Sequence, residues 1–322
     1  MRRVLPWVVA FVLAIGAGGG AVAGLNATVF GPGDFVRVYL DALARGDAQG
    51  ALALPGVDAA GADGRLLEDD VLTGLTDLRQ VSDEDLGAGE HRVTFAWVSP
   101  FGDGTTAFDV HPVGTRFGLF PEWGFSESPV AVLTLDVLHD PRFTVNGAAE
   151  TTGQDDAAPA EYAVLVPGSY VIGHDTAFLQ ADPTTVLANY VGGAATVTVD
   201  VQAGPAFAST LDDEVREHLT ECTKQAVLFP TGCPFGETIT NRIVSEPVWS
   251  MVVFPELTIA PGDAFGTWLA GPAGGTAHLK VDVKSLFDGT VTTFDQHVVF
   301  QVSYTCTIDG DTLHITEDAP RD

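Results

Sequence analysis

Basic residues are scarce in this sequence. Its 322 residues include 15 Lys and Arg against 43 Asp and Glu, so the formal net charge is -28. Proteins that bind nucleic acid take much of their affinity from Lys and Arg placed on phosphates, and anionic lipid headgroups attract the same side chains. The composition therefore excludes a nucleic-acid partner and disfavours docking on anionic lipid. The high negative charge indicates a soluble, self-repelling surface.

The motifs that mark common catalytic sites are missing as well. The sequence has no GxSxG nucleophile elbow, HExxH zinc helix, GxxxxGK[ST] phosphate loop, GxGxxG turn or DxDxDG calcium loop. The string nearest to an elbow, at residues 124–128, lacks its closing glycine. We therefore predict a protein that is not an enzyme, with no catalytic, cofactor-binding or metal-binding residue.

Cysteine is rare too, and the three that occur are Cys222, Cys233 and Cys306. In an oxidising compartment the spacing of the first two predicts a short-range disulfide, which would stabilise the fold by about 3 kcal/mol. Cys306 lies in the strand-like segment FQVSYTCTI and is expected to be a buried, inert free thiol. Intermolecular pairing and redox chemistry are the alternatives for it. A zinc site would need a second close pair such as CxxC, which the sequence does not contain.

One long apolar run is present, at residues 4–25, directly behind Arg2 and Arg3. A run of about 20 apolar residues has the length of a membrane-spanning helix, and flanking basic residues hold that end in the cytoplasm. We predict a cytoplasmic N-terminus at residues 1–3, a transmembrane signal anchor at 4–25, and the bulk of the chain outside the cell. The alternative is a secreted protein cleaved after Ala23, because residues 21–23 have the small-x-small form of a cleavage site.

The next segment, residues 31–150, begins with helical patterns and continues with alternating ones. Asp34 and Asp47 are suited to cap two helices, FVRVYLDALAR and AQGALAL, and a third helical piece is expected around residues 66–71. From Thr76 onward the alternation predicts a series of antiparallel strands. Their large aromatic residues are expected to fill a core rather than to form a ligand platform: Trp97, Phe101, Phe117, Phe120 and Trp123.

The rest of the chain divides by composition. Residues 151–160 are small, polar and acidic, as in a linker, and residues 161–209 read as a small β module. Residues 210–322 again open with an amphipathic helix and continue as strands. The order of helix and then curved sheet has therefore occurred twice, which predicts a divergent duplication around the β module.

The helix, Gly46-Asp47, helix opening and the strands after it resemble the cystatin-like or NTF2-like superfamily. That resemblance covers roughly residues 34–150 and implies an α+β roll, in which helices pack across a strongly bent sheet. Some such folds carry an Asp or His base and a Tyr donor on the concave face, where Asp109 with His111, or His278 with His297, could lie. All eight histidines are nevertheless expected at surface or edge positions.

The whole plan also resembles a group of uncharacterised actinobacterial envelope proteins. The matching features are the N-terminal apolar run, the strings FVRVYLDALARGD and VPGSY, and the segment from Cys222 to PTGCPFG at residues 230–236. This resemblance implies location and architecture, and no catalytic residues.

These observations favour a non-enzymatic, membrane-anchored extracytoplasmic protein that binds or spaces a cell-surface partner. The expected partners are the membrane, through the N-terminal helix, and an envelope protein or wall polymer. No cofactor is expected. The alternative is an NTF2-like-fold enzyme or small-ligand-binding protein, acting through a single pocket.

Overall fold

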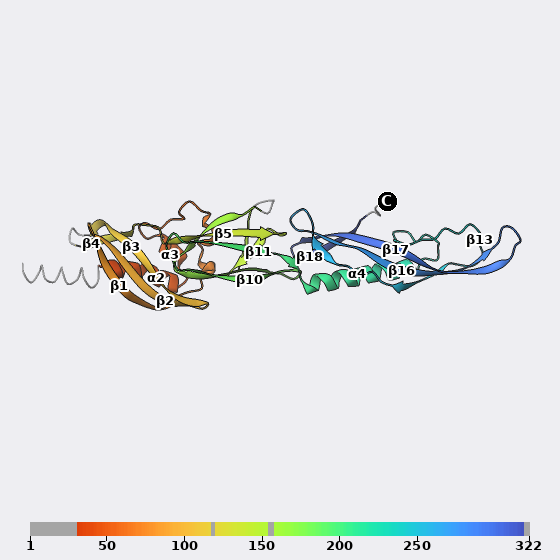
Figure 1. Ribbon diagram of the computed structural model, residues 1–322, viewed down its shortest axis with the longest axis horizontal. Helices are drawn as coiled ribbons and strands as arrows, with labels where there is room; N and C mark the ends of the chain where they lie inside the picture. Colours follow the sequence, from red (N-terminus) through yellow and green to blue (C-terminus); the bar gives the residue numbers. More distant parts are fainter. Residues whose placement is uncertain (1–30, 117–119, 154–157, 319–322) are drawn as a thin grey trace, which may run out of the picture.

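The computed structural model describes residues 31–116, 120–153 and 158–318. Of these residues, 52% lie in strands and 15% in helices, so the protein is mostly β. Three units follow one another along the long axis of the molecule (Figure 1). We call them the helix–sheet unit (31–126), the sandwich (130–203) and the hairpin unit (205–318).

The helix–sheet unit packs a short helix pair against one antiparallel sheet. Its elements are α2 (Pro32–Ala44), α3 (Ala48–Leu52), the 3-10 turns η1 (Gly64–Leu66) and η2 (Asp69–Val71), and strands β1 (Thr76–Gly87), β2 (Glu90–Ser99), β3 (Gly102–Arg116) and β4 (Phe120–Phe125). Pro32 lies in the first turn of α2, where its missing N–H costs nothing. The Asp47 carboxylate accepts the Gly50 N–H at 2.7 Å and so begins α3.

The sandwich consists of two sheets that face each other. One sheet has the order β11–β5–β8, with β11 parallel to β5, and the other has the order β12–β10–β9–β6–β7. The strands are β5 (Val130–Leu138), β6 (Arg142–Val145), β7 (Ala148–Thr151), β8 (Ala160–Leu165), β9 (Gly168–Asp175), β10 (Leu179–Ala188), β11 (Ala194–Asp200) and β12 (Gln202–Ala203). Across the interior, the rings of Phe143 and Tyr162 lie 5.7 Å apart.

The hairpin unit is built on two very long strands. It contains α4 (Pro205–Thr223), β13 (Arg242–Ile243), β14 (Val248–Val253), β15 (Ile259–Pro261), β16 (Thr267–Lys284), β17 (Val291–Asp309) and β18 (Thr312–Glu317). Strands β16 and β17 pair along nearly their whole length, and α4 lies beside them (Figure 1). The sequence predicts an amphipathic helix from residue 210, and the helix begins earlier, at Pro205, and ends at Thr223. It buries one apolar stripe: Phe207, Leu211, Val215, Leu219 and Cys222.

Shared contacts connect the three units. The buried Tyr39 hydroxyl of α2 lies 2.8 Å from the Val166 carbonyl oxygen and 3.0 Å from that of Pro129, so the two carbonyls, next to β8 and β5, share its one proton. At the other end of the sandwich, the Gly266 N–H donates to the His139 carbonyl at 2.8 Å. The Phe207 ring lies 6.1 Å from the Trp268 ring, and both side chains are fully buried. The sandwich and the hairpin unit therefore share one continuous hydrophobic core.

The predicted fold class is wrong. We expected an α+β chain with two cystatin-like or NTF2-like rolls, and the structure is mostly β. The decisive difference lies in strand pairing: β5 and β6, assigned by sequence to the first roll, pair instead with β8, β11 and β9 of the sandwich. Alternation identifies a strand and its buried face but does not identify its partner.

The membrane part of that prediction must also be corrected. Within the residues that the structure describes, no helix is long and apolar enough to cross a membrane. The run at residues 4–25 lies outside the described residues. The transmembrane, single-pass and signal-anchor assignments therefore have no support, and we do not carry them further.

Removing the Tyr39 hydroxyl should destabilise the junction between the first two units. We expect Tyr39→Phe to lower the free energy of unfolding by about 1–3 kcal/mol, because it leaves two buried carbonyls without their donor. Urea denaturation measures this loss. Tyr190→Phe is the matched control, since Tyr190 is 71% exposed and should tolerate the change. Equal stability of the two variants would contradict the role given to Tyr39.

Candidate functional site

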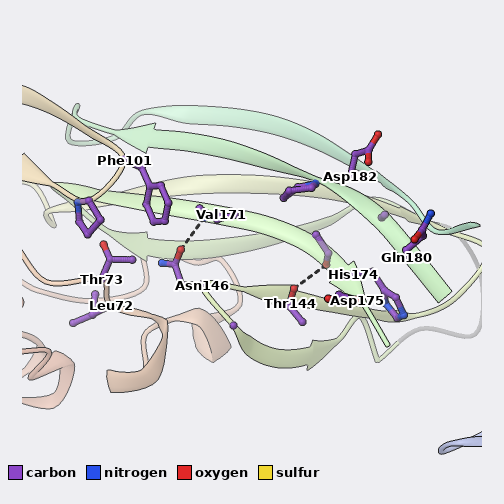
Figure 2. A pocket seen from close by; sticks show the side chains of 15 residues that line it. Leu72, Thr73, Phe101, Thr144, Asn146, Val171, His174, Asp175, Gln180 and Asp182 are labelled. Carbon is purple, nitrogen blue, oxygen red and sulfur yellow. Dashed lines mark hydrogen bonds between the residues drawn. The ribbon is translucent and has the colours of Figure 1, made fainter. Parts of the chain in front are cut away.

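A groove with a volume of about 750 Å³ lies on the outer face of the sandwich. Tyr170 and Ile172 of β9 point into the sandwich core and are 1% exposed. Because side chains alternate along a strand, Val171 and Gly173 lie on the opposite face and form the floor of the groove. Figure 2 shows the groove following β9 from Phe101 at one end to Asp175 and Gln180 at the other.

A β-bulge shapes the middle of the groove. The pairing of β10 with β9 shifts register between Ala181 and Thr184, so that Asp182 and Pro183 form the irregular step. A Cβ atom at Gly173 would lie 3.3 Å from the Cα of Pro183, which is tighter than an ordinary contact. Glycine at this position therefore allows the two backbones to approach closely.

Asn146 fixes the near wall of the groove. Its amide nitrogen donates to the carbonyls of Val71, at 2.6 Å, and Ser169, at 2.9 Å, and its amide oxygen accepts the Val171 N–H at 2.8 Å. The residue has a φ of 52°, which asparagine tolerates better than most residues. Asn146 is thus a structural part of the lining, because its polar atoms are already engaged.

Two loops of the helix–sheet unit complete the walls. Thr73, just after η2, lies with its hydroxyl 3.1 Å from that of Ser169. Phe101, in the turn between β2 and β3, is 50% exposed and lines the groove (Figure 2). The prediction that Phe101 belongs to the core is therefore wrong, whereas Trp97 is 1% exposed as expected. Phe117 lies outside the described residues.

Three polar side chains along the groove are free to contact a ligand. Asp175 and Gln180 are direct partners on β9 and β10, and Asp182 lies at the bulge. All three are exposed, and within the residues that the structure describes they make no side-chain hydrogen bond. Sequence reasoning did not single them out, although an Asp-Pro step inside an alternating strand was a signal for a bulge.

His174 is an exception to the expectation that all histidines lie at the surface. It is 3% exposed, and its Nδ1 lies 2.9 Å from the Arg142 carbonyl oxygen, to which it donates. Its Nε2 lies 3.3 Å from the hydroxyl of Thr176. His174 therefore holds the end of β9 in place.

The sequence offers two candidate acid–base pairs, which lie in different units. The first, Asp109 and His111, lies on β3 of the helix–sheet unit. Asp109 forms a two-bond ion pair with Arg92, at 2.7 Å for each bond, and His111 lies 3.1 Å from the Ser126 hydroxyl. The side of this sheet that packs against α2 is filled by buried aromatic rings: Tyr39, Phe95, Trp97, Phe108 and Phe125.

The second pair, His278 and His297, is brought together on neighbouring strands. The ring centroids lie 5.4 Å apart, and His278 Nε2 lies 2.7 Å from the Asp295 carboxylate. This hydrogen bond lowers the pKa of Asp295. No tyrosine among the described residues forms a hydrogen bond with either histidine.

Cys222 and Cys233 form a disulfide in the structure, with their Cα atoms 5.9 Å apart. Cys306 is a buried free thiol, and burial raises its pKa to about 11. A thiol with that pKa remains protonated near neutral pH, and burial keeps it from reagents in solvent. These features argue against a redox role for Cys306 in the native fold.

One group of possible metal ligands occurs among the described residues: His218, Cys222 and Cys233, whose ligand atoms all lie within 4.8 Å of one another. Both sulfur atoms are engaged in the disulfide, so they are not free ligands in the oxidised protein. His218 was expected, with the other histidines, at a surface or edge position and not as a ligand. The signal that could have found it is the HxxxC spacing, which puts both side chains on one helix face.

Comparisons with protein-family models, curated proteins and solved structures found nothing that matches this chain. The functional argument therefore depends on the geometry of the groove.

Replacing Asn146 should damage the groove wall and the sandwich together. We expect Asn146→Ala to lower the free energy of unfolding by about 2–3 kcal/mol, because three hydrogen bonds are lost and two carbonyls lose their donor. Denaturant unfolding provides the measurement, with Asn241→Ala at an exposed loop position as the control. A loss of stability no greater than that of the control would show that Asn146 does not hold this wall.

Proposed function

We propose that this protein is a non-catalytic, extracytoplasmic binding protein whose sandwich groove takes up an extended, hydroxyl-rich polymer such as a cell-wall glycan. One observation supports the proposal most: the same groove contains an exposed aromatic ring and polar side chains without hydrogen-bond partners among the described residues. The carboxylates of Asp175 and Asp182 and the amide of Gln180 line one part of it, and the Phe101 ring lines the other.

The charge of the lining limits the ligand. Lys and Arg do not occur among the residues that line the groove. Carboxylates only accept hydrogen bonds, so the ligand has to supply donors. Phosphate-rich ligands would be repelled, whereas sugar hydroxyls can donate to the carboxylates and both donate to and accept from the amide.

Phe101 supplies the apolar complement. An exposed aromatic ring offers a flat surface on which the C–H face of a sugar ring can pack, while its hydroxyl groups remain at the edges. The aliphatic parts of Leu72 and Pro100 extend this surface at the same end of the groove. An apolar platform with a few polar groups is the usual composition of a ligand site.

The elongated shape of the groove favours a polymer as the ligand. The disulfide favours a location outside the cytoplasm. The residues that line the groove follow strand β9 from Phe101 to Asp175 and Gln180, an elongated arrangement that suits an extended chain (Figure 2). Disulfides persist in oxidising compartments, and the Cys222–Cys233 bond is consistent with such a location. The three units in line also suit a protein that presents a binding face at a distance (Figure 1).

Substitutions inside the groove should weaken glycan binding, and the same kinds of substitution elsewhere on the surface should not. We expect Phe101→Ala, and Asp175→Asn combined with Asp182→Asn, each to weaken binding of purified cell-wall glycan by about tenfold or more, because each removes a central contact. Titration calorimetry of the full chain provides the affinities.

Phe287→Ala and Asp311→Asn are the matched controls for this experiment. Phe287 is 99% exposed in the turn between β16 and β17, and Asp311 is exposed in the turn before β18. We expect both controls to bind as the parent protein does. Unchanged affinity in the groove variants, or binding of a lysine-rich peptide in place of the glycan, would contradict the proposal.

A further inference from the structure

The disulfide lies among side chains that suit a metal ion. His218 and Cys222 are four residues apart on α4, so their side chains lie on the same helix face. Cys233 approaches from the following loop, and Glu317, the last residue of β18, approaches from the sheet. Two sulfurs and one imidazole therefore lie within 4.8 Å of one another, and the Glu317 carboxylate lies 3.8 Å from the imidazole. All four are groups of the types that bind zinc.

The spacing of these groups already suits a tetrahedral ion. His218 Nε2 lies 3.8 Å from Cys222 Sγ and 3.8 Å from Glu317 Oε2. Ligand atoms around a tetrahedral Zn²⁺, with bonds of about 2.0–2.3 Å, lie roughly 3.3–3.8 Å from one another. Two movements complete the site: the sulfur atoms separate when the bond between them is broken, and the Glu317 carboxylate approaches them from beside His218.

The surroundings also suit a bound ion. The side-chain amide of Gln225 donates to Cys233 Sγ at 3.6 Å, the kind of contact that orients a thiolate ligand.

A cavity and an unpaired donor lie next to the site. A cavity of about 390 Å³ is lined by Pro234, which follows Cys233, and by Glu317. Tyr304, the strand partner of Glu317, also lines this cavity; it is 4% exposed and its hydroxyl has no hydrogen-bond partner among the described residues.

We propose that the reduced protein binds one Zn²⁺ ion through Cys222, Cys233, His218 and Glu317, so that disulfide and zinc are alternative states of the same site. A dithiol reductant supplies two electrons and two protons to the disulfide and is itself oxidised to a disulfide. Zn²⁺ then displaces the two thiol protons to solvent as the thiolates coordinate it. The inference is independent of the groove and its ligand.

The test is an anaerobic titration of the full chain with Co²⁺ and then Zn²⁺, after reduction by a dithiol and removal of the reductant. We expect the reduced chain to bind one equivalent of Co²⁺ with the intense visible absorption of a tetrahedral thiolate site, and Zn²⁺ to displace it. The oxidised chain should show no such absorption. His218→Ala and Glu317→Gln should each weaken Zn²⁺ binding by about tenfold or more.

Two controls keep the outcome clear. His314→Ala, at an exposed position on β18, and Cys306→Ala should both bind as the parent chain does. Near-ultraviolet circular dichroism follows folding: if reduction disturbs the fold, one equivalent of Zn²⁺ should restore it. Reduced chain that binds no metal, binding unaffected by His218→Ala, or a fold that zinc does not restore would overturn the proposal.

Discussion

Strand β5 holds the molecule together, because its backbone is paired on both sides and its side chains reach both hydrophobic cores. It lies parallel to β11 along seven residue pairs and antiparallel to β8 along six. Val130, at its start, belongs to the core beneath α2, whereas Leu133, Leu135 and Val137 belong to the core shared with the hairpin unit. Both sides of this strand depend on segments distant in sequence, so the fold depends on contacts that form only when the whole sandwich assembles.

The groove is a consequence of this assembly. Because β6, β9 and β10 turn their apolar side chains toward β5 and its neighbours, their other face is left for polar and small residues. The loops at Thr73 and Phe101 border that face from the helix–sheet unit, and the Tyr39 hydrogen bonds hold that unit in place. A rigid junction gives the groove a fixed wall, which reduces the entropy lost when a ligand binds.

The sequence was informative about local structure and much less so about pairing. Asp47 as a helix cap, the apolar stripe of α4 and the buried Cys306 could all be predicted, because each depends on residues close in the chain. Which apolar residues of α2 are buried was harder to predict: Val36, Tyr39 and Leu40 are fully buried, whereas Val38 is 55% exposed. Partners of β5, by contrast, are set by three-dimensional packing that alternation cannot encode.

The difference between local and long-range information also explains why the residues of the candidate sites were hard to predict. Phe101 looked like core because large aromatic residues usually are, and only the position of its turn beside β9 makes it part of a groove. Asp175, Gln180 and Asp182 belong together only through the pairing of β9 with β10. Glu317 lies beside His218 through the packing of α4 near β18, across about a hundred residues of chain, whereas His218 and Cys222 are neighbours on α4 itself.

Hydrogen exchange of the full chain, with and without purified cell-wall glycan, tests the central claim that the outer face of the sandwich is the binding surface. Bound ligand should slow exchange at amides that border the groove: Leu72, Thr73, Phe101, Gly173 and Asp182. Exchange in the turn at residues 285–290 should not change. Protection confined to that turn or to the helix–sheet unit, or no protection at saturating glycan, would contradict the account.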